Sequence, residues 1–234
     1  MNKAIVVTGG TKGIGRAIVN LFADKGFDII TCSRSRADLE GLKAELEARH
    51  TGGAFEYLEA DLSDRQQVQA FVEFAMTHAA RIQVLVNNTG VFIPGQIQNE
   101  EEGVFEQMLN TNLSSAYHIT RGLLPALINN KGHIFNMCST ASIMPYVNGG
   151  SYCISKFALL GMTKVLREEL KEKGVRVTAI MPGATMTASW AGTELPEDRF
   201  MPAADVAHAV WAAYALSPRT VIEEIVMRPQ LGDL

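Results

Sequence analysis

Apolar residues along this chain follow two alternating patterns. Short runs that are almost wholly apolar alternate with longer segments in which apolar residues recur every three or four positions. A short, continuous apolar run is typical of a strand that is buried on both faces. We predict seven such strands, at residues 3–8, 27–33, 55–60, 82–88, 133–138, 175–183 and 221–227.

The segments between these runs have the spacing of amphipathic helices. The first helix is predicted from Ile14 to Lys25 and ends at Gly26, a residue type that commonly follows a helix. Ser35 is the predicted cap of the second helix, which buries Leu39, Leu42 and Leu46. The remaining helices are predicted at residues 63–79, 100–129, 152–173 and 203–216.

The strict alternation of strands and helices predicts how the elements pack. Parallel strands are joined by right-handed helical crossovers, and wholly apolar strands need helices over both faces. The expected fold class is α/β: a three-layer, doubly wound Rossmann fold with a seven-stranded parallel sheet. We expect one domain over 1–234, with a dinucleotide-binding part at about 1–138 and a catalytic and substrate part at about 139–234. Ligands of such folds bind beyond the carboxyl ends of the strands.

Composition and charge narrow the classes of function. The 234 residues carry a formal net charge of −4 with scattered Lys and Arg, so neither nucleic acid nor an anionic membrane is an expected partner. No apolar run has the length of a membrane span, and the apolar stretch near the N-terminus is too short for a signal peptide. We expect a cytoplasmic protein with reduced cysteines and, from the spacing of its histidines, no metal site.

A glycine-rich loop, "TGGTKGIG", lies between the first predicted strand and the first predicted helix. Glycine permits positive φ angles and lets a ligand approach the backbone, while the helix N-terminus attracts a pyrophosphate. The alternative is an ordinary glycine-rich turn, but this position between strand and helix favours a dinucleotide. The candidate cofactor residues of the loop are Gly9, Thr11, Lys12, Gly13, Ile14 and Gly15.

The end of the second predicted strand indicates which dinucleotide binds. NAD sites usually have an acidic residue there, but this chain has Ser33 followed by Arg34. A guanidinium can hold a phosphate by paired, charge-assisted hydrogen bonds, and Lys12 in the glycine loop can reach the same group. Each cation alone is equally well explained as a solvated surface residue. Together they favour NADP(H) over NAD(H).

The sequence "SYCISK" places Tyr152 and Lys156 four positions apart in a predicted helix. Residues at this spacing share one helix face. A free phenol loses its proton near pH 10, and a neighbouring ammonium favours the phenolate. The pair is therefore a candidate proton-transfer device, although two unrelated side chains on one helix remain an alternative at this point.

These features together resemble the short-chain dehydrogenase/reductase family over essentially the whole chain. Within this family, the chain is similar to the 3-oxoacyl-carrier-protein reductases and to the carbonyl reductases. Its C-terminus resembles that of the smaller carbonyl-reductase-like and hydroxy-acid dehydrogenase branches more than that of the carrier-protein reductases. The matching motifs, in order, are "TGGTKGIG", "ADLSD" at 60–64, "NNTG" at 87–90, Asn112 in "LNTNL", Ser139 in "NMCSTAS", Tyr152 with Lys156, and "PGATMT" at 182–187.

The resemblance implies an NADP(H)-dependent oxidoreductase that reduces a carbonyl to an alcohol, or the reverse, by hydride transfer. Tyr152 would act as general acid and base, and Lys156 would tune it and hold the nicotinamide ribose. Ser139 would align the carbonyl oxygen, and Asn112 would hold a water that relays protons to Lys156. Other cofactor residues would be Asp61 and Leu62 at the adenine, Asn88 and Gly90 at the ribose, and Pro182, Gly183, Thr185 and Thr187 around the nicotinamide.

Two alternatives and two departures from the family pattern accompany this interpretation. A non-catalytic NADP(H)-binding regulator would keep the glycine loop without the Tyr152–Lys156 pair. A hydrolase with Ser139 or Cys138 as nucleophile lacks a Gly-x-Ser-x-Gly turn. One departure is Thr89, where the family usually has alanine, and the sequence offers no reason for it. The other is the segment "IVMRPQLGDL" after the last strand, where many relatives have a glycine-rich segment.

The substrate and the assembly are less defined by the sequence. Residues 184–201 are expected to form a flap in which Met186, Trp190 and Phe200 either line an apolar pocket or belong to the core. A small ketone, a 3-oxo acid, a pterin side chain and an acyl thioester all remain open. The helices predicted at 100–129 and 152–173 correspond to dimer surfaces of the family, so a homodimer or homotetramer is expected.

Overall fold

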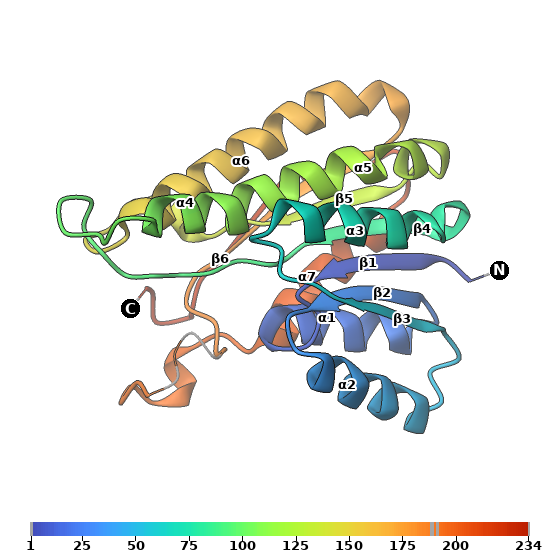
Figure 1. The fold of residues 1–234 in the computed structure, drawn as a ribbon, viewed down its shortest axis with the longest axis horizontal. Coiled ribbons are helices and arrows are strands. Elements are labelled where there is room, and N and C mark those ends of the chain that lie inside the picture. The colour runs from blue at the N-terminus through green and yellow to red at the C-terminus, as the bar shows by residue number, and fades with distance from the viewer. Residues whose placement is uncertain (1, 188–189, 191, 234) are drawn as a thin grey trace.

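A parallel sheet forms the centre of the molecule (Figure 1). The computed structural model describes residues 2–187, 190 and 192–233. Within these residues the chain forms seven parallel strands in the order β3-β2-β1-β4-β5-β6-β7, which confirms the predicted fold class. The strands are β1 (Ala4–Thr8), β2 (Asp28–Ser33), β3 (Phe55–Glu59), β4 (Ile82–Asn87), β5 (His133–Met137), β6 (Arg176–Pro182) and β7 (Glu224–Met227).

Helices cover both faces of this sheet, as Figure 1 shows. One face carries α1 (Gly13–Asp24), α2 (Arg36–Ala48) and α7 (Ala203–Ala215). The other face carries α3 (Arg65–Met76), α4 (Val104–Leu109), α5 (Ser115–Asn129) and α6 (Gly150–Leu170). The central strands therefore have no solvated face, which explains why they are largely apolar.

Alternate residues of β1 supply the two separate cores. Ala4 and Val6 belong to the core beneath α3 and α5, whereas Ile5 and Val7 belong to the core beneath α1 and α7. All four are completely buried. This follows from strand geometry, since successive side chains point to opposite faces.

The direction in which strands are added reverses at β1, which pairs with β2 on one side and with β4 on the other. At the carboxyl end of this pair, the Thr8 hydroxyl accepts hydrogen bonds from the backbone N–H groups of Asn88 and Thr89, both at 2.9 Å. The glycine loop after β1 and the loop after β4 are thus fastened together. A doubly wound sheet binds its ligands at such a reversal point.

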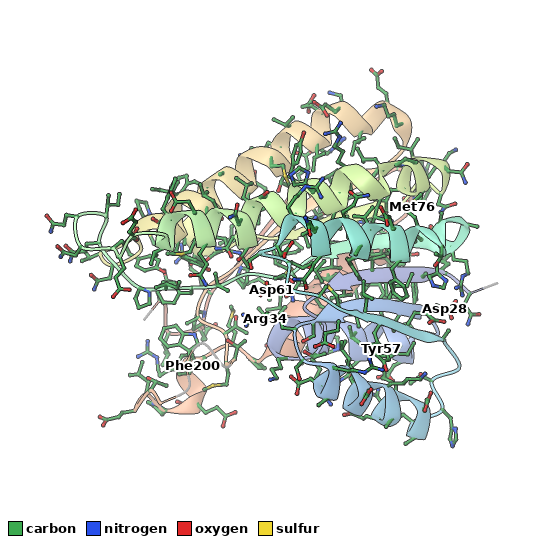
Figure 2. All side chains as sticks on the ribbon, viewed as in Figure 1. Asp28, Arg34, Tyr57, Asp61, Met76 and Phe200 are labelled. Atoms are coloured by element: carbon green, nitrogen blue, oxygen red, sulfur yellow. The ribbon has the colours of Figure 1, made fainter. Side chains whose placement is uncertain are left out.

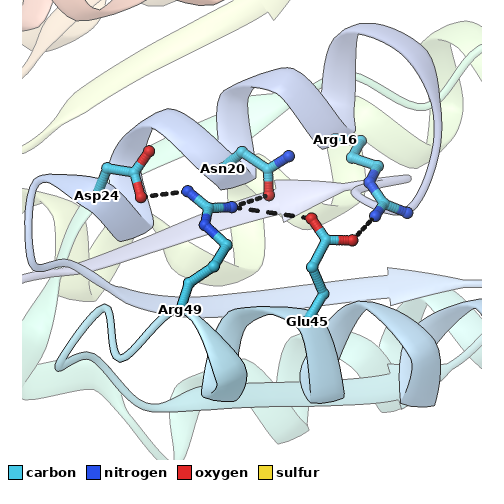
Figure 3. Close-up of polar contacts among 5 residues, drawn as sticks. All are labelled: Arg16, Asn20, Asp24, Glu45 and Arg49. Carbon is cyan, nitrogen blue, oxygen red and sulfur yellow. Dashed lines mark hydrogen bonds and ion pairs between the residues drawn. The ribbon is translucent and has the colours of Figure 1, made fainter.

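An ionic network holds α2 against α1 (Figure 3). Arg49 forms an ion pair with Asp24, donates to Asn20 Oδ1 at 3.1 Å and lies 3.8 Å from Glu45. Glu45 in turn pairs with Arg16. Each exposed pair contributes little alone, but together they hold the C-terminal half of α2 along α1.

The bounds of several elements differ from the prediction by a few residues, and the two main differences concern the helix expected at 100–129 and the last strand. The helix expected at 100–129 begins at Val104, after Gly103 with its φ of 91°, and contains a π-helical turn at Asn110–Ser114. The last strand spans Glu224–Met227, although its apolar run begins at residue 221. Of the helices in the described ranges, none combines the length and apolar character that crossing a bilayer requires.

Candidate active site

A cavity of about 370 Å³ lies at the carboxyl ends of the central strands. Its walls come from the segments after β4, β5 and β6, from α6 and from the C-terminal tail. Among the residues predicted from the sequence, the cavity is lined by Ile14, Asn88, Gly90, Ser139, Tyr152, Lys156, Pro182, Gly183, Thr185 and Thr187. Residues from distant parts of the chain therefore meet at the expected place.

Tyr152 and Lys156 lie in α6 with their side chains beside each other. The Lys156 Nζ atom is 5.7 Å from the centre of the Tyr152 ring and donates a hydrogen bond to the Met137 carbonyl oxygen at 2.7 Å. Lys156 is only 5% exposed, so its ammonium is fixed at the end of β5. Its remaining N–H groups can serve a ribose hydroxyl or a water. This placement favours the proton-transfer interpretation over two unrelated side chains.

Ser139 follows β5 and caps a short turn, which is compatible with the chemical role predicted for it. Its Oγ accepts a hydrogen bond from the Ala141 N–H at 3.1 Å, which caps a short 3₁₀ turn over Thr140–Ser142. Because the hydroxyl is the acceptor there, its own proton remains available for a carbonyl oxygen in the cavity. The cap fixes the Ser139 hydroxyl in position. This is compatible with the prediction that the hydroxyl aligns a substrate carbonyl.

Asn112 lies in the π-helical turn and is 1% exposed. Its Oδ1 accepts from the Val91 N–H at 2.7 Å, and its Nδ2 donates to the Val91 carbonyl at 3.0 Å and to Ser155 Oγ at 2.9 Å. The amide thus fastens the loop after β4 to α6. The second lone pair of Asn112 Oδ1 can accept a hydrogen bond from a water. The relay of protons through this water to Lys156 stays a prediction.

The glycine loop fits a dinucleotide pyrophosphate. Gly9 has a φ of 67° and Gly13 a φ of 53°, and a Cβ on Gly15 would lie 2.3 Å from the Gly9 carbonyl oxygen. In the described part of the chain, Lys12 makes no side-chain cap to the first turn of α1. The first N–H groups of this helix are therefore free of a side-chain cap and available to an anion.

The far end of the cofactor site carries positive charge. Figure 2 shows Arg34 at the carboxyl end of β2 and Asp28 at its amino end. Arg34 is exposed, and Ser33 accepts a hydrogen bond from the Thr11 hydroxyl at 3.0 Å. Lys12 does not point freely to this end: its Nζ lies 2.7 Å from Asp38 Oδ2. That hydrogen bond lowers the pKa of Asp38 below its usual value.

Asp61 and Leu62 occupy the segment after β3. Asp61 Oδ1 accepts from the Ser63 N–H at 2.9 Å, and the Asp61 N–H donates to Gln67 Oε1 at 2.8 Å. Leu62 is 4% exposed and belongs to the core beneath α3. The Asp61 carboxylate is thus fixed beside the start of α3, while its predicted contact with the adenine stays a prediction.

Thr89 faces the glycine loop. Its Oγ1 is buried and, within the described residues, has no hydrogen-bond partner. A Cβ on Gly9 would lie 2.9 Å from this oxygen. The Thr89 hydroxyl therefore occupies the space that a side chain at position 9 would need. It packs against the glycine loop at Gly9.

The flap supplies part of the cavity wall. Trp190 lines the cavity, whereas Phe200 is 6% exposed and packs on Trp190 with ring centres 4.9 Å apart. The Met186 N–H donates to the Met201 carbonyl at 2.9 Å. The expectation of an apolar lining thus holds for Trp190, whereas Phe200 belongs to the interior. Residues 188, 189 and 191 of the flap lie outside the described residues.

Sequence reasoning missed several cavity residues and a buried polar network beneath them. The missed lining residues include Val91, Phe92, Thr140, Met144, Tyr146 and Asp233. Asn87 Nδ2 donates to Thr120 Oγ1 at 2.9 Å and to Asn136 Oδ1 at 2.8 Å, and Asn136 Nδ2 donates to Thr163 Oγ1 at 2.8 Å. This network joins β4 and β5 to α5 and α6. In the sequence, this network is indicated only by the asparagines Asn87 and Asn136, which interrupt two otherwise apolar runs.

The structure opposes a cysteine hydrolase. Cys138 lines the cavity, but burial raises the pKa of its thiol to about 11, despite the lowering effect of Lys156. The thiol is therefore protonated at neutral pH and is a poor nucleophile. The described ranges contain no group of three or more His, Cys, Asp or Glu side chains suited to a metal ion.

A doubly wound sheet, a glycine loop with an open helix N-terminus and a Tyr–Lys pair beside one cavity define a dinucleotide-dependent oxidoreductase. Comparison with protein families agrees, since residues 3–198 match the family described as short chain dehydrogenase. The chain belongs to the short-chain dehydrogenase family, which confirms the resemblance seen in the sequence.

Individual relatives extend this comparison. Sepiapterin reductase of Chlorobaculum tepidum is 34% identical over 100% of this chain and 99% of its own length. A metagenomic short-chain oxidoreductase in complex with NADP is 29% identical, with a TM-score of 0.84 and 97% of each chain covered. A short-chain dehydrogenase from Sphingobium yanoikuyae in complex with NADPH is 26% identical, with a TM-score of 0.84 over 98% of this chain and 88% of its own.

Proposed function

We propose that this protein is an NADP-dependent oxidoreductase that interconverts a carbonyl and an alcohol, with Tyr152 as general acid and base. One observation carries the assignment of roles: Tyr152, Lys156 and Ser139 line the same cavity as the loops that would hold the cofactor. When bound, the reduced cofactor supplies the hydride. The relatives that contain NADP or NADPH support this choice of cofactor.

The protein's own groups perform the remaining steps. Ser139 donates a hydrogen bond to the carbonyl oxygen and holds it near the Tyr152 hydroxyl. Tyr152 then gives its proton to that oxygen as negative charge develops on it. The Lys156 ammonium stabilises the resulting phenolate and gives it a proton, and a water held by Asn112 then returns a proton to the neutral Lys156 amine. In the oxidising direction the same transfers run in reverse.

The candidate cofactor residues form a continuous path on the protein. The glycine loop holds the pyrophosphate, while Arg34 and Lys12 hold the phosphate that distinguishes NADP from NAD. Asp61 and Leu62 lie toward the adenine, and Asn88 and Gly90 toward the ribose. The segment 182–187 closes the nicotinamide end, where Thr187 lies against Gly13: a Cβ on Gly13 would be 3.0 Å from the Thr187 methyl carbon.

The cavity favours a compact ring substrate with N–H donors. Phe92, Tyr146 and Trp190 supply aromatic walls, and Asp233 adds a carboxylate from the C-terminal tail, where it pairs with Arg228. While it pairs with Arg228, this carboxylate still has lone pairs that can accept hydrogen bonds from N–H groups of a substrate. The full-length similarity to a sepiapterin reductase supports the pterin side chain among the substrates left open by the sequence. We therefore propose a pterin-type ketone as the substrate.

Replacing Asp233 by Asn tests this substrate class. With sepiapterin and NADPH, Asp233→Asn is expected to raise KM about 10- to 100-fold, the effect of losing a charge-assisted hydrogen bond of roughly 1.5–3 kcal/mol. With a small ketone that lacks N–H groups, KM is expected to change less than threefold. Absorbance of NADPH measures both reactions, and Asp198→Asn, an exposed site, is the control. Equal effects on both substrates would contradict the proposed contact.

A homo-oligomer is proposed from apolar side chains left exposed on α5 and α6. Tyr117, Ile154, Phe157 and Val165 are each 41–56% exposed. Two such helices can bury these side chains against the same helices of a second copy. Light scattering of the purified protein is expected to give the mass of a dimer or tetramer, and Phe157→Glu is expected to reduce that mass. A monomer at micromolar concentration would refute the assembly.

Two broader expectations from the sequence stay predictions. One is the division of the domain into a dinucleotide-binding part, 1–138, and a catalytic part, 139–234. The glycine loop and Arg34 lie in the first part and the Tyr152–Lys156 pair in the second, which supports the division. The other is location in the cytoplasm.

A further inference from the structure

The helix that carries Tyr152 starts without a cap of its own. Its N-cap residue is Gly149, and within the described residues no side-chain hydrogen bond from the N-cap position caps this helix. Gly150, Ser151 and Tyr152 form the first turn of α6. The first N–H groups of a helix need partners from outside the helix. The position of Tyr152 therefore depends on what meets this turn.

Glu100, from the loop before α4, supplies the missing cap. Its Oε1 accepts a hydrogen bond from the Ser151 backbone N–H at 2.8 Å, and its Oε2 accepts one from the Ser151 hydroxyl. Ser151 is 2% exposed, so both bonds are protected from water. A carboxylate at a helix N-terminus also interacts favourably with the helix dipole.

Two glycines allow this close approach. A Cβ on Gly150 would lie 2.1 Å from Glu100 Oε1 and 2.7 Å from the Gly95 carbonyl oxygen. A Cβ on Gly95 would lie 2.8 Å from Glu100 Cγ. The Gly95 N–H also donates to the Asn148 carbonyl at 3.0 Å. The loop thus lies directly on the start of α6.

The same loop contacts the Tyr152 ring. Phe92 meets it edge to face, with ring centres 4.9 Å apart and planes at 72°. At the base of the loop, Val91 is held through both its N–H and its carbonyl by Asn112. Residues 91–100 therefore bridge the π-helical turn, the tyrosine ring and the first turn of α6.

We propose that Glu100 is a positioning residue for Tyr152. Its carboxylate closes the first turn of α6 through Ser151, which keeps the Tyr152 hydroxyl beside the cavity. Loss of the carboxylate leaves the Ser151 N–H unpaired, so the turn opens and the hydroxyl spends less time in the reacting position. The glycine loop is not part of this contact, and Lys156 is held separately by the Met137 carbonyl, so cofactor binding is expected to persist without Glu100. The proposal rests on the proposed function of Tyr152.

Glu100→Ala, compared with Glu101→Ala and Glu102→Ala, tests the proposal. The two neighbours are exposed acids on the same loop and match the change in charge. Glu100→Ala is expected to lower kcat about 10- to 100-fold, with the NADPH Kd, measured by fluorescence titration, unchanged within twofold. Glu100→Gln keeps an acceptor oxygen for the Ser151 N–H and is expected to retain most of kcat. The controls are expected to keep wild-type kcat.

Hydrogen exchange gives a second readout that does not need turnover. In Glu100→Ala the amides of Ser151 and Tyr152 are expected to exchange at least tenfold faster, with little change in the rest of α6. Wild-type kcat in Glu100→Ala, or NADPH affinity that falls by the same factor as kcat, would overturn the positioning role. A further outcome is that Tyr152→Phe retains activity while Glu100→Ala still increases the amide exchange rates of Ser151 and Tyr152. That result would refute the proposed function of Tyr152 and would still support Glu100 as the cap of α6.

Discussion

Tyr152→Phe is expected to lower kcat by about 10²- to 10⁴-fold, the usual contribution of a positioned general acid. The substitution removes the proton that neutralises the developing oxyanion and leaves the aromatic ring in place. Phe92 can still pack against that ring, and Lys156 can still donate to the Met137 carbonyl, as it does at 2.7 Å. The fold and the cofactor loops are therefore preserved. Turnover is followed by NADPH absorbance, and NADPH binding by fluorescence titration.

Tyr146 is the informative comparison for this experiment because it is a second tyrosine on the cavity wall. Burial, followed by the neighbouring Tyr152 and Cys153, raises the pKa of the Tyr146 phenol above its usual value. Tyr146 is therefore a weaker proton donor than an ordinary phenol. Tyr146→Phe is expected to lower kcat less than tenfold. A Tyr152→Phe protein that turns over normally, or a larger loss in Tyr146→Phe, would show that the wrong tyrosine had been chosen as the acid.

The fold could be predicted because each central strand is buried on both faces. In β1, Ile5 and Val7 face one core while Ala4 and Val6 face the other, so the run is apolar without interruption. The π-helical turn at Asn110–Ser114 could not be predicted, since one inserted residue barely changes the apolar spacing over a long helix. The carboxyl ends of adjacent parallel strands meet at one edge, which is why the motifs pointed to one site.

What the sequence could not provide was the partner of each side chain. Glu100 and Ser151 are far apart in the chain and share no motif, yet they hold each other at the start of α6. Asp233 reaches the cavity only because the tail after β7 returns toward Gly183, where an added Cβ would lie 3.3 Å from Asp233 Oδ1. Such contacts depend on how the whole chain packs, and no local pattern encodes them.

The choice between the two nicotinamide cofactors depends on the charge at the end of β2. Arg34 is exposed there, so its guanidinium can meet a phosphate without a buried partner being lost. Lys12 must leave Asp38 to join it, but an exposed ion pair of this kind is worth only about 0–1 kcal/mol. A doubly charged phosphate competes easily for that ammonium. Both cations are therefore available to the cofactor.

Arg34→Asp is accordingly expected to lower kcat/KM for NADPH about 10²- to 10³-fold. It removes charge-assisted hydrogen bonds of roughly 1.5–3 kcal/mol and adds repulsion between a carboxylate and the phosphate. For NADH, kcat/KM is expected to stay equal or to rise, because an acid at the end of the second strand can hold the ribose hydroxyls. Initial rates with each cofactor at a fixed substrate concentration measure the change.

Arg36→Asp is the matched control, since Arg36 is an exposed arginine two positions further on that pairs with Glu40 at 2.8 Å. It is expected to change the NADPH preference less than threefold. If Arg36→Asp weakened NADPH use as much as Arg34→Asp, general surface charge would explain the preference and a specific phosphate contact would not. If Arg34→Asp left NADPH kinetics unchanged, the phosphate would have to be held by other groups, with Lys12 as the remaining cation in the glycine loop.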